Sequence, residues 1–167
     1  MLTKITNFLH YLMGKTSELG DLEKKDVLLS KVVLDIHRKR THTDFVSVPL
    51  FQLHQIHAID RENAMAATAR RIAELEKIKT ELLEEKNITR EILAEYLPSV
   101  SWIKVVQESD ASFIAYEGNG RLVALQKVFT PDDNIQVEVE QYFFHDSEKI
   151  LKRMNRIRHM NGLVKKS

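Results

Sequence analysis

The residues best suited to chemistry lie in a glycine-containing turn between two apolar segments, at residues 112–129, with the sequence SFIAYEGNGRLVALQKVF. The four residues FIAY are typical of a short buried strand, and the apolar residues of LVALQKVF recur with the period of a helix. A helix that begins after such a turn has unpaired backbone N–H groups in its first turn, where the helix dipole is also positive. The turn therefore favours an anion, typically phosphate.

Each polar residue of this turn suggests a role. Gly118, Asn119, Gly120 and Arg121 are expected to hold phosphate oxygens, with the guanidinium of Arg121 giving two hydrogen bonds. Glu117 is suited to holding a magnesium ion, or to orienting an attacking hydroxyl group or water molecule. We therefore take Glu117 and Arg121 as candidate catalytic residues, and Glu117 as the candidate metal ligand. The alternative is a structural turn, in which the glycines serve backbone geometry and Arg121 forms an internal salt bridge.

This run resembles the signature of the ParB N-terminal-like domain, a family shared by ParB partition proteins, sulfiredoxin and some free-standing kinases and nucleases. In that signature a strand leads into G-E-R-R-x-R-A and then into a helix. The pattern is matched at three positions, Gly118, Arg121 and Ala124. Its Glu, first Arg and last Arg are replaced by Asn119, Gly120 and Val123. The flanking segments at residues 46–53 and 135–139 are also similar to strands of the family.

The resemblance implies a domain at residues 44–146 that binds a nucleotide or another phosphate-containing ligand. It also implies a nuclease or phosphotransferase that uses a divalent cation such as Mg²⁺. In the free-standing kinases that the motif resembles, an acidic residue stands just before the glycine, as Glu117 does here. The replacement of the family's Glu by Asn119 and the loss of two arginines predict weaker binding of a triphosphate. Sulfiredoxin's own reaction is excluded, because that branch uses a catalytic cysteine and this chain has no cysteine.

The composition is that of an ordinary globular protein. The 167 residues suffice for one domain with a substantial core, since 43% are hydrophobic and 29% are charged. The absence of cysteine excludes disulfides and zinc sites of the cysteine type. No apolar run approaches the roughly 20 residues that a membrane span needs, and the features of a signal peptide are missing. We therefore expect no membrane partner and a cytoplasmic location.

Residues 1–43 are expected to form a helical segment that precedes the motif domain. One amphipathic helix is indicated at Ile5–Met13, and a second begins near a cap at Asp21. We expect this segment to pack on the sheet of the domain. The alternative is a separate arm that binds a partner.

A long helix is expected within an insertion at about residues 58–97. It would begin at a cap on Asp60 and reach about Lys86, with apolar residues along one side and charges elsewhere. Its apolar stripe is narrower than that of a core helix, so pairing with its own copy in a homodimer is also considered. Thr89 then caps a short helix that Pro98 ends.

The C-terminal segment, residues 147–167, is basic and holds no acidic residue after Glu148. Its apolar residues recur along one edge, which predicts a basic amphipathic helix. Such a helix can neutralise phosphates and release their counterions, so four of its cations are candidate nucleic-acid-binding residues: Lys152, Arg153, Arg156 and Arg158. The alternative is a solvated helix whose charge balances the acidic middle of the chain.

Strands are expected at residues 45–50, 102–106, 112–116 and 135–142, and the second and third form a hairpin that delivers the turn. These elements predict an α+β fold, a small mixed sheet with a ParB/sulfiredoxin-like core flanked by N-terminal, central and C-terminal helices. The expected function is binding of a nucleotide or nucleic acid, with nuclease or phosphotransferase activity. The alternative is a non-catalytic DNA-associated or protein-interaction module in which the turn is structural.

Overall fold

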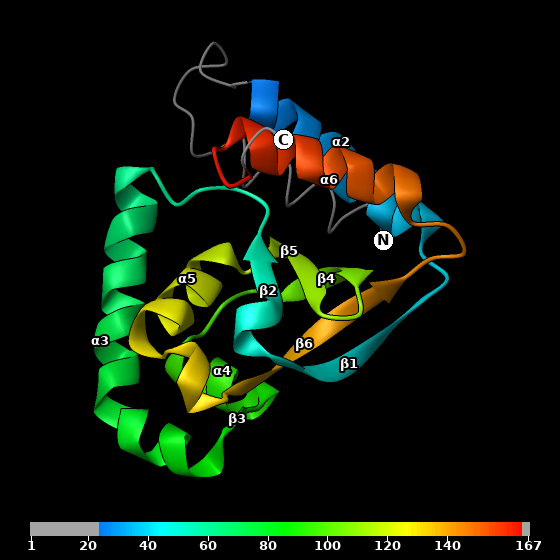
Figure 1. Ribbon diagram of the computed structural model, residues 1–167. Coiled ribbons are helices and arrows are strands. Elements are labelled where there is room, and N and C mark those ends of the chain that lie inside the picture. Colours follow the sequence, from blue (N-terminus) through cyan, green and yellow to red (C-terminus); the bar gives the residue numbers. More distant parts are fainter. Residues whose placement is uncertain (1–23, 165–167) are drawn as a thin grey trace.

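The computed structural model describes residues 24–164, and their elements are arranged in three layers (Figure 1). The helices are α2 (Lys24–Lys39), α3 (Glu62–Glu85), α4 (Arg90–Tyr96), α5 (Asn119–Val128) and α6 (Glu148–Met160). The strands are β1 (His42–Pro49), β2 (Leu53–Gln55), β3 (Asn87–Ile88), β4 (Lys104–Ser109), β5 (Ser112–Glu117) and β6 (Gln136–Phe143). This content confirms the α+β prediction. The predicted helix at Ile5–Met13 and the predicted cap at Asp21 lie outside the described residues.

The strands form one mixed sheet with the order β1-β6-β4-β5-β2, and β3 pairs with the start of β6. β1 and β6 are antiparallel along their full length, from His42 opposite Phe143 to Pro49 opposite Gln136. β4 and β5 form the predicted antiparallel hairpin, although β4 begins at Lys104 and not at residue 102. The pairs β2–β5, β3–β6 and β4–β6 are parallel. The mixed sheet therefore agrees with the prediction.

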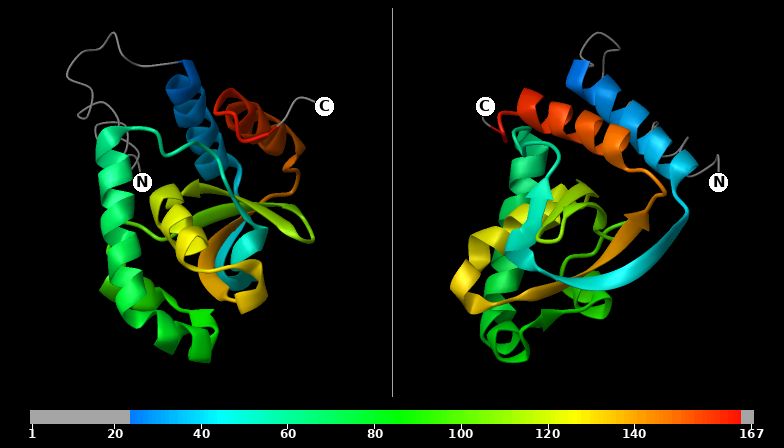
Figure 2. Two further views of the ribbon diagram at one scale, coloured as in Figure 1. Left: turned by 60° about the vertical axis from the view of Figure 1, so that its left-hand side comes forward. Right: turned by 45° about the vertical axis from the view of Figure 1, so that its right-hand side comes forward.

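The sheet separates two hydrophobic clusters, one on each face. Helices α3, α4 and α5 cover one face, and α2 and α6 cover the other (Figure 2). Successive side chains of β5 point to opposite faces of the sheet. Phe113 and Ala115 belong to the first cluster, whereas Ile114 and Tyr116 belong to the second. A strand that is covered on both faces has apolar side chains at every position, which explains the unbroken apolar run in this segment.

Helix α3 packs along α5 in the first of these layers. It begins after Arg61, which occupies the N-cap position with extended backbone, so the predicted cap at Asp60 is wrong. Asp60 pairs instead with Lys25, whose Nζ lies 3.4 Å from Oδ2. Leu75 and Leu82 of α3 are buried in the core of the same chain. The apolar stripe that suggested a homodimer thus has an intramolecular role, and the homodimer itself stays a prediction.

Helix α4 is fastened to the sheet by its first residues. The predicted cap is confirmed, because the Thr89 side chain accepts a hydrogen bond from the N–H of Ile92 at 3.4 Å. The guanidinium of Arg90 lies 3.7 Å from the centre of the Phe45 ring, and its Nε lies 2.5 Å from Oε1 of Glu138. These contacts join α4 to β1 and β6.

Helices α2 and α6 lie side by side across the second face and run in opposite directions (Figures 1 and 2). Ile36 of α2 and both Met154 and Ile157 of α6 are buried between the helices and the sheet. Arg153 of α6 pairs with Asp35 of α2. The apolar edge expected of the C-terminal helix therefore faces the core. Across residues 24–164, no helix combines the length and the apolar content that a membrane crossing requires.

Candidate functional site

The predicted strand, turn and helix are present as β5, Gly118 and α5, and residues 117–121 are called the α5 turn below. Gly118 has a φ of 84° and a ψ of 20°, a left-handed conformation that glycine adopts without strain. A Cβ atom at this position would lie 2.8 Å from Cγ1 of Ile103, in the segment before β4. Backbone conformation and close approach therefore both require glycine at this position.

The first turn of α5 presents backbone donors at its end. No side chain caps the helix. Its regular hydrogen bonding starts with the N–H of Leu122, which lies 2.9 Å from the carbonyl oxygen of Gly118. The N–H groups of Asn119, Gly120 and Arg121 come before this bond and have no acceptor within the helix. They point out of the helix end, where the dipole adds positive potential.

The side chain of Asn119 is buried and fixes the α5 turn to the end of β2. Its Oδ1 accepts hydrogen bonds from the N–H groups of Ile56 at 2.9 Å and of His57 at 3.4 Å. Its Nδ2 donates to the carbonyl oxygen of Ala115 at 2.8 Å. The amide is thus committed to internal hydrogen bonds, and its side chain has no group left for a ligand.

Arg121 is a buried cation with an incomplete set of partners. The residue is only 3% exposed, and its Nη2 has no hydrogen-bond partner among the described residues. That atom lies 3.1 Å from the position that a Cβ on Gly118 would take, so the guanidinium folds back against the turn. Burial, together with the charge of Arg71, lowers the pKa of Arg121 to about 10, while Glu117 acts in the opposite direction. The group therefore stays charged at neutral pH.

A second guanidinium, that of Arg71 on α3, lies against the same turn. A Cβ on Gly120 would lie 2.5 Å from Nη1 of Arg71 and 3.6 Å from Oγ1 of Thr68. Glycine at this position therefore allows α3 and its arginine to approach the backbone of α5 closely. Two cations at one helix end repel each other, and an anion beside them would offset this repulsion. The sequence did not indicate Arg71, because it lies in a distant helix with an ordinary alternation of charges.

Glu117 ends β5 and is half-buried beside the turn. Its Oε1 accepts a hydrogen bond from the hydroxyl of Ser101 at 2.5 Å. Residues 24–164 contain no group of three or more His, Cys, Asp or Glu side chains placed to hold a metal ion. Glu117 belongs to no such group in this part of the chain, so a Mg²⁺ ion there would need ligands from a bound phosphate and water.

The four cations predicted to bind nucleic acid do not share one face of α6. Lys152, Arg153 and Arg156 are exposed on the outer side of the helix. Arg153 is also paired with Asp35 of α2. Arg158 is only partly exposed and points to the edge of the sheet. The structure therefore brings the first three together and separates Arg158 from them.

Arg158 helps to close the edge strand β2. Its Nε donates to the carbonyl oxygen of Gln55 at 2.9 Å, and its Nη1 donates to Oδ1 of Asn155 at 3.2 Å. Gln126 of α5 acts in the same way, since its Nε2 donates to the carbonyl oxygen of Leu53 at 2.9 Å. Side chains that occupy edge carbonyls protect a strand from pairing with another chain. This role accounts for the burial that lowers the pKa of Arg158.

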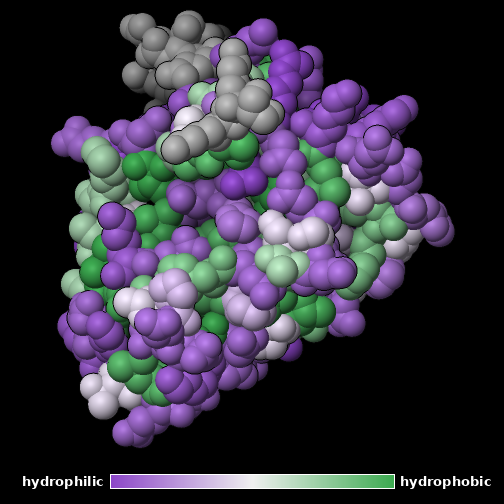
Figure 3. Space-filling view, in the orientation of Figure 1, coloured by the Kyte–Doolittle hydropathy of each residue, from purple (hydrophilic) through white to green (hydrophobic). Residues whose placement is uncertain are grey.

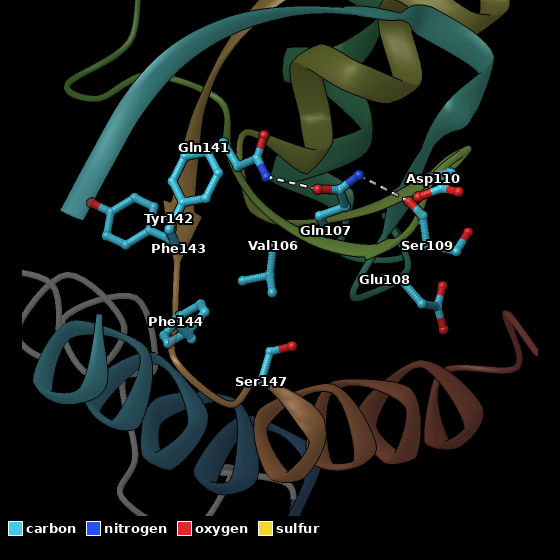
Figure 4. Close-up of a pocket in the computed structure, with 10 residues that line it drawn as sticks. All are labelled: Val106, Gln107, Glu108, Ser109, Asp110, Gln141, Tyr142, Phe143, Phe144 and Ser147. Carbon is cyan, nitrogen blue, oxygen red and sulfur yellow. Dashed lines mark hydrogen bonds between the residues drawn. The ribbon is translucent and has the colours of Figure 1, made fainter. Parts of the chain in front are cut away.

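Two surface hollows lie away from the α5 turn. The first has a volume of about 280 Å³ and lies between β4, β6 and the start of α6 (Figure 4). There Gln141 donates to Oε1 of Gln107 at 3.1 Å, and Gln107 donates to the carbonyl oxygen of Ser109 at 3.2 Å. Glu108 and Asp110 also line it, so its charge disfavours phosphate. The second hollow, of about 290 Å³, lies beside β2.

Comparisons with models of known protein families, with curated protein sequences and with solved structures found no match. The resemblance to the ParB N-terminal-like domain therefore stays a prediction from the motif.

Proposed function

We propose that this protein binds the phosphate group of a nucleotide-like ligand at the α5 turn. The observation that carries the proposal is the buried guanidinium of Arg121, whose Nη2 lies against Gly118 and lacks a partner among the described residues. Buried charges in proteins are normally paired, because an uncompensated charge in the interior costs several kcal/mol. A phosphate oxygen at the helix end would supply the missing acceptor.

The ligand would be held by donors from the backbone and from side chains. The N–H groups of Asn119, Gly120 and Arg121 would donate to phosphate oxygens along the axis of α5. The guanidinium of Arg121 would add a charge-assisted hydrogen bond, and Arg71 would add positive charge from α3. Gly118 supplies the conformation of the turn. These donors recognise the phosphate and leave the choice of base and sugar to other contacts.

A catalytic role for Glu117 extends the same proposal. Ser101 fixes the orientation of the carboxylate by donating to Oε1. A carboxylate beside bound phosphates can hold Mg²⁺ while phosphate and water complete the octahedral coordination. In this arrangement Glu117 would serve a nuclease or phosphotransferase, in line with the ParB-like resemblance. Glu117→Gln should then abolish turnover and preserve phosphate binding, and undiminished turnover would contradict the catalytic role.

A structural turn is the second candidate, and Asn119 is the observation that favours it. Two hydrogen bonds of its amide join the α5 turn to the segment after β2, and a third joins it to Ala115 of β5, which is an architectural task. This alternative leaves Arg121 unexplained, because no described residue accepts a hydrogen bond from its Nη2. We therefore place phosphate binding first.

A thermal-shift screen tests the proposal with inorganic phosphate and nucleoside mono-, di- and triphosphates, each with and without Mg²⁺. A ligand that binds only the native state stabilises it by about 2.7 kcal/mol at a hundredfold excess over Kd. In a domain of this size, that raises Tm by roughly 5–10 °C. We expect this shift in the native protein and in the control Arg70→Met, which removes an exposed cation of α3. Arg121→Met should show no shift.

Two results would contradict the proposed site. One is the absence of a shift in the native protein with every phosphate compound. The other is a shift of equal size in Arg121→Met, which would place the ligand elsewhere.

A further inference from the structure

The outer side of α2 and α6 carries a concentration of positive charge. The exposed basic residues of α2 are Lys24, Lys31, Arg38 and Lys39. The exposed basic residues of α6 are Lys149, Lys152, Arg153 and Arg156. These eight residues are called the α2–α6 basic face. In Figure 3 the region of these helices, at the upper right, is largely hydrophilic.

The acidic residues of the two helices leave most of this charge uncompensated. Asp26 pairs with Arg61, whose Nη2 lies 2.8 Å from Oδ2, and Asp35 pairs with Arg153. Both aspartates are partly buried. Within α2 and α6, as the structure describes them, Glu148 is the one exposed acidic residue. The face therefore has a strong excess of cations.

The cations are arranged in rows along the two helices. On α2, Lys24, Lys31 and Arg38 occupy every seventh position, which places them on one side of the helix about 10.5 Å apart. On α6, cations about one turn apart form a second row: Lys149, Lys152 and Arg156. The row on α2 is about 21 Å long, which corresponds to roughly six base pairs of a duplex at 3.4 Å each.

We infer that the α2–α6 basic face docks on the phosphate backbone of a nucleic-acid duplex. Rows of cations neutralise several phosphates together and release their counterions. No aromatic residue belongs to the face, so stacking on bases is not part of the contact. The contacts are to phosphates, and binding is accordingly insensitive to base sequence.

An anionic membrane is the competing polyanion, and the apolar residues of the two helices argue against it. Stable binding in a membrane interface needs side chains such as Trp, Phe or Leu that insert among the lipids. On the described helices α2 and α6, the exposed large hydrophobic residues are Val27 and Met160 alone. The face offers charge without an apolar anchor, which suits a nucleic acid.

The charge of α3, on the other face of the sheet, also favours a nucleic acid, because it orients the protein toward a polyanion. Helix α3 exposes two cations, Arg70 and Lys77, against six glutamates: Glu62, Glu74, Glu76, Glu81, Glu84 and Glu85. It packs on the other face of the sheet, and only its N-terminal end approaches α2, where Arg61 pairs with Asp26 (Figure 2). Such an uneven charge distribution steers the basic face toward a polyanion and turns the acidic helix away from it.

This inference goes beyond the phosphate site, because α5 lies on the other face of the sheet. A duplex and a nucleotide would therefore occupy separate surfaces. A nucleotide added at constant ionic strength should not displace the duplex. Failure of either proposal leaves the other open to its own test.

The test measures binding of the full chain to a fluorescent DNA duplex of about 20 base pairs, by anisotropy, between about 50 and 200 mM salt. The variant Lys31→Ala/Lys152→Ala/Arg156→Ala removes three cations from the basic face. We expect it to reduce the slope of log K against log salt by about 2.7, since each phosphate contact contributes about 0.9.

The matched control is Arg70→Ala/Lys77→Ala/Lys127→Ala, which removes three exposed cations from α3 and α5 and changes the net charge equally. It should keep the slope of the native protein. Because all six side chains are exposed, both variants should keep the native circular dichroism spectrum and Tm.

Four outcomes would overturn the inference. Equal losses of slope in both triple variants would indicate a general charge effect, and no loss in the basic-face variant would exclude these residues. Displacement of the duplex by a nucleotide at constant ionic strength would place the duplex at the α5 turn. Binding to vesicles of phosphatidylserine without binding to the duplex would assign the face to membranes.

Discussion

Replacement of Arg121 by methionine should stabilise the protein in phosphate-free buffer. The guanidinium is buried, and its pKa falls from the usual value for arginine to about 10, so the fold disfavours the charged form by about 3 kcal/mol. This penalty is fully present below pH 10 and disappears only as the pH rises from there toward the usual pKa of arginine. Methionine has a similar length and no charge. A gain of about 1–3 kcal/mol in the free energy of unfolding is therefore expected.

Urea unfolding at neutral pH in a buffer without phosphate measures this gain. Arg70→Met, at an exposed position of α3, serves as the control and should change the free energy of unfolding by less than about 0.5 kcal/mol. Saturating ligand should close or reverse the gap, because it stabilises only the protein with Arg121. A loss of more than about 1 kcal/mol in phosphate-free buffer would refute the reasoning, since it would show that Arg121 is a structural residue.

Three further substitutions test the local account. Gly118→Ala should cost about 2–4 kcal/mol in urea unfolding, because alanine would be strained at a φ of 84° and would meet Ile103; an unchanged midpoint would count against the turn geometry. Asn119→Ala should cost about 2–3 kcal/mol through its lost buried hydrogen bonds, and a cost below about 0.5 kcal/mol would show that these bonds are unimportant. Burial and nearby cations, chiefly Lys104, lower the pKa of His37 from 6.5 to about 4, so the unfolded chain binds a proton that the folded chain does not. Stability should therefore fall by about 1–2 kcal/mol from pH 6.5 to pH 4 after allowance for solvent screening, and His37→Gln should flatten this fall; equal slopes would exclude His37 as its cause.

The strand, turn and helix of the α5 turn could be predicted because local chemistry determines them. The unbroken apolar run at Phe113–Tyr116 suits a strand covered on both faces, and the structure covers β5 in this way. A glycine between such a run and a helical pattern indicates a turn with a positive φ, which Gly118 has. The cap at Thr89 follows from the same local logic.

The partners of the site could not be predicted, because they come from distant parts of the chain. Arg71 reaches the turn only through the packing of α3 on α5, and the sequence of α3 shows an ordinary charged helix. Asn119 appeared suited to a phosphate, yet its amide is held by the backbone N–H of Ile56, just after β2, and by the carbonyl oxygen of Ala115 in β5. The sequence of the C-terminal segment predicted one basic helix. In the structure, exposed cations of α2 lie beside those of α6, and Arg158 points to β2 instead.

The central claim is that a phosphate binds at the end of α5, and backbone amide chemical shifts test it most directly. The protein is labelled with ¹⁵N and titrated first with inorganic phosphate and then with a nucleotide, at constant ionic strength. We predict saturable shifts that are largest at the amides of Asn119, Gly120 and Arg121, because these groups donate to the phosphate oxygens. Shifts confined to α2 and α6, or no saturable shift in the α5 turn, would contradict the account.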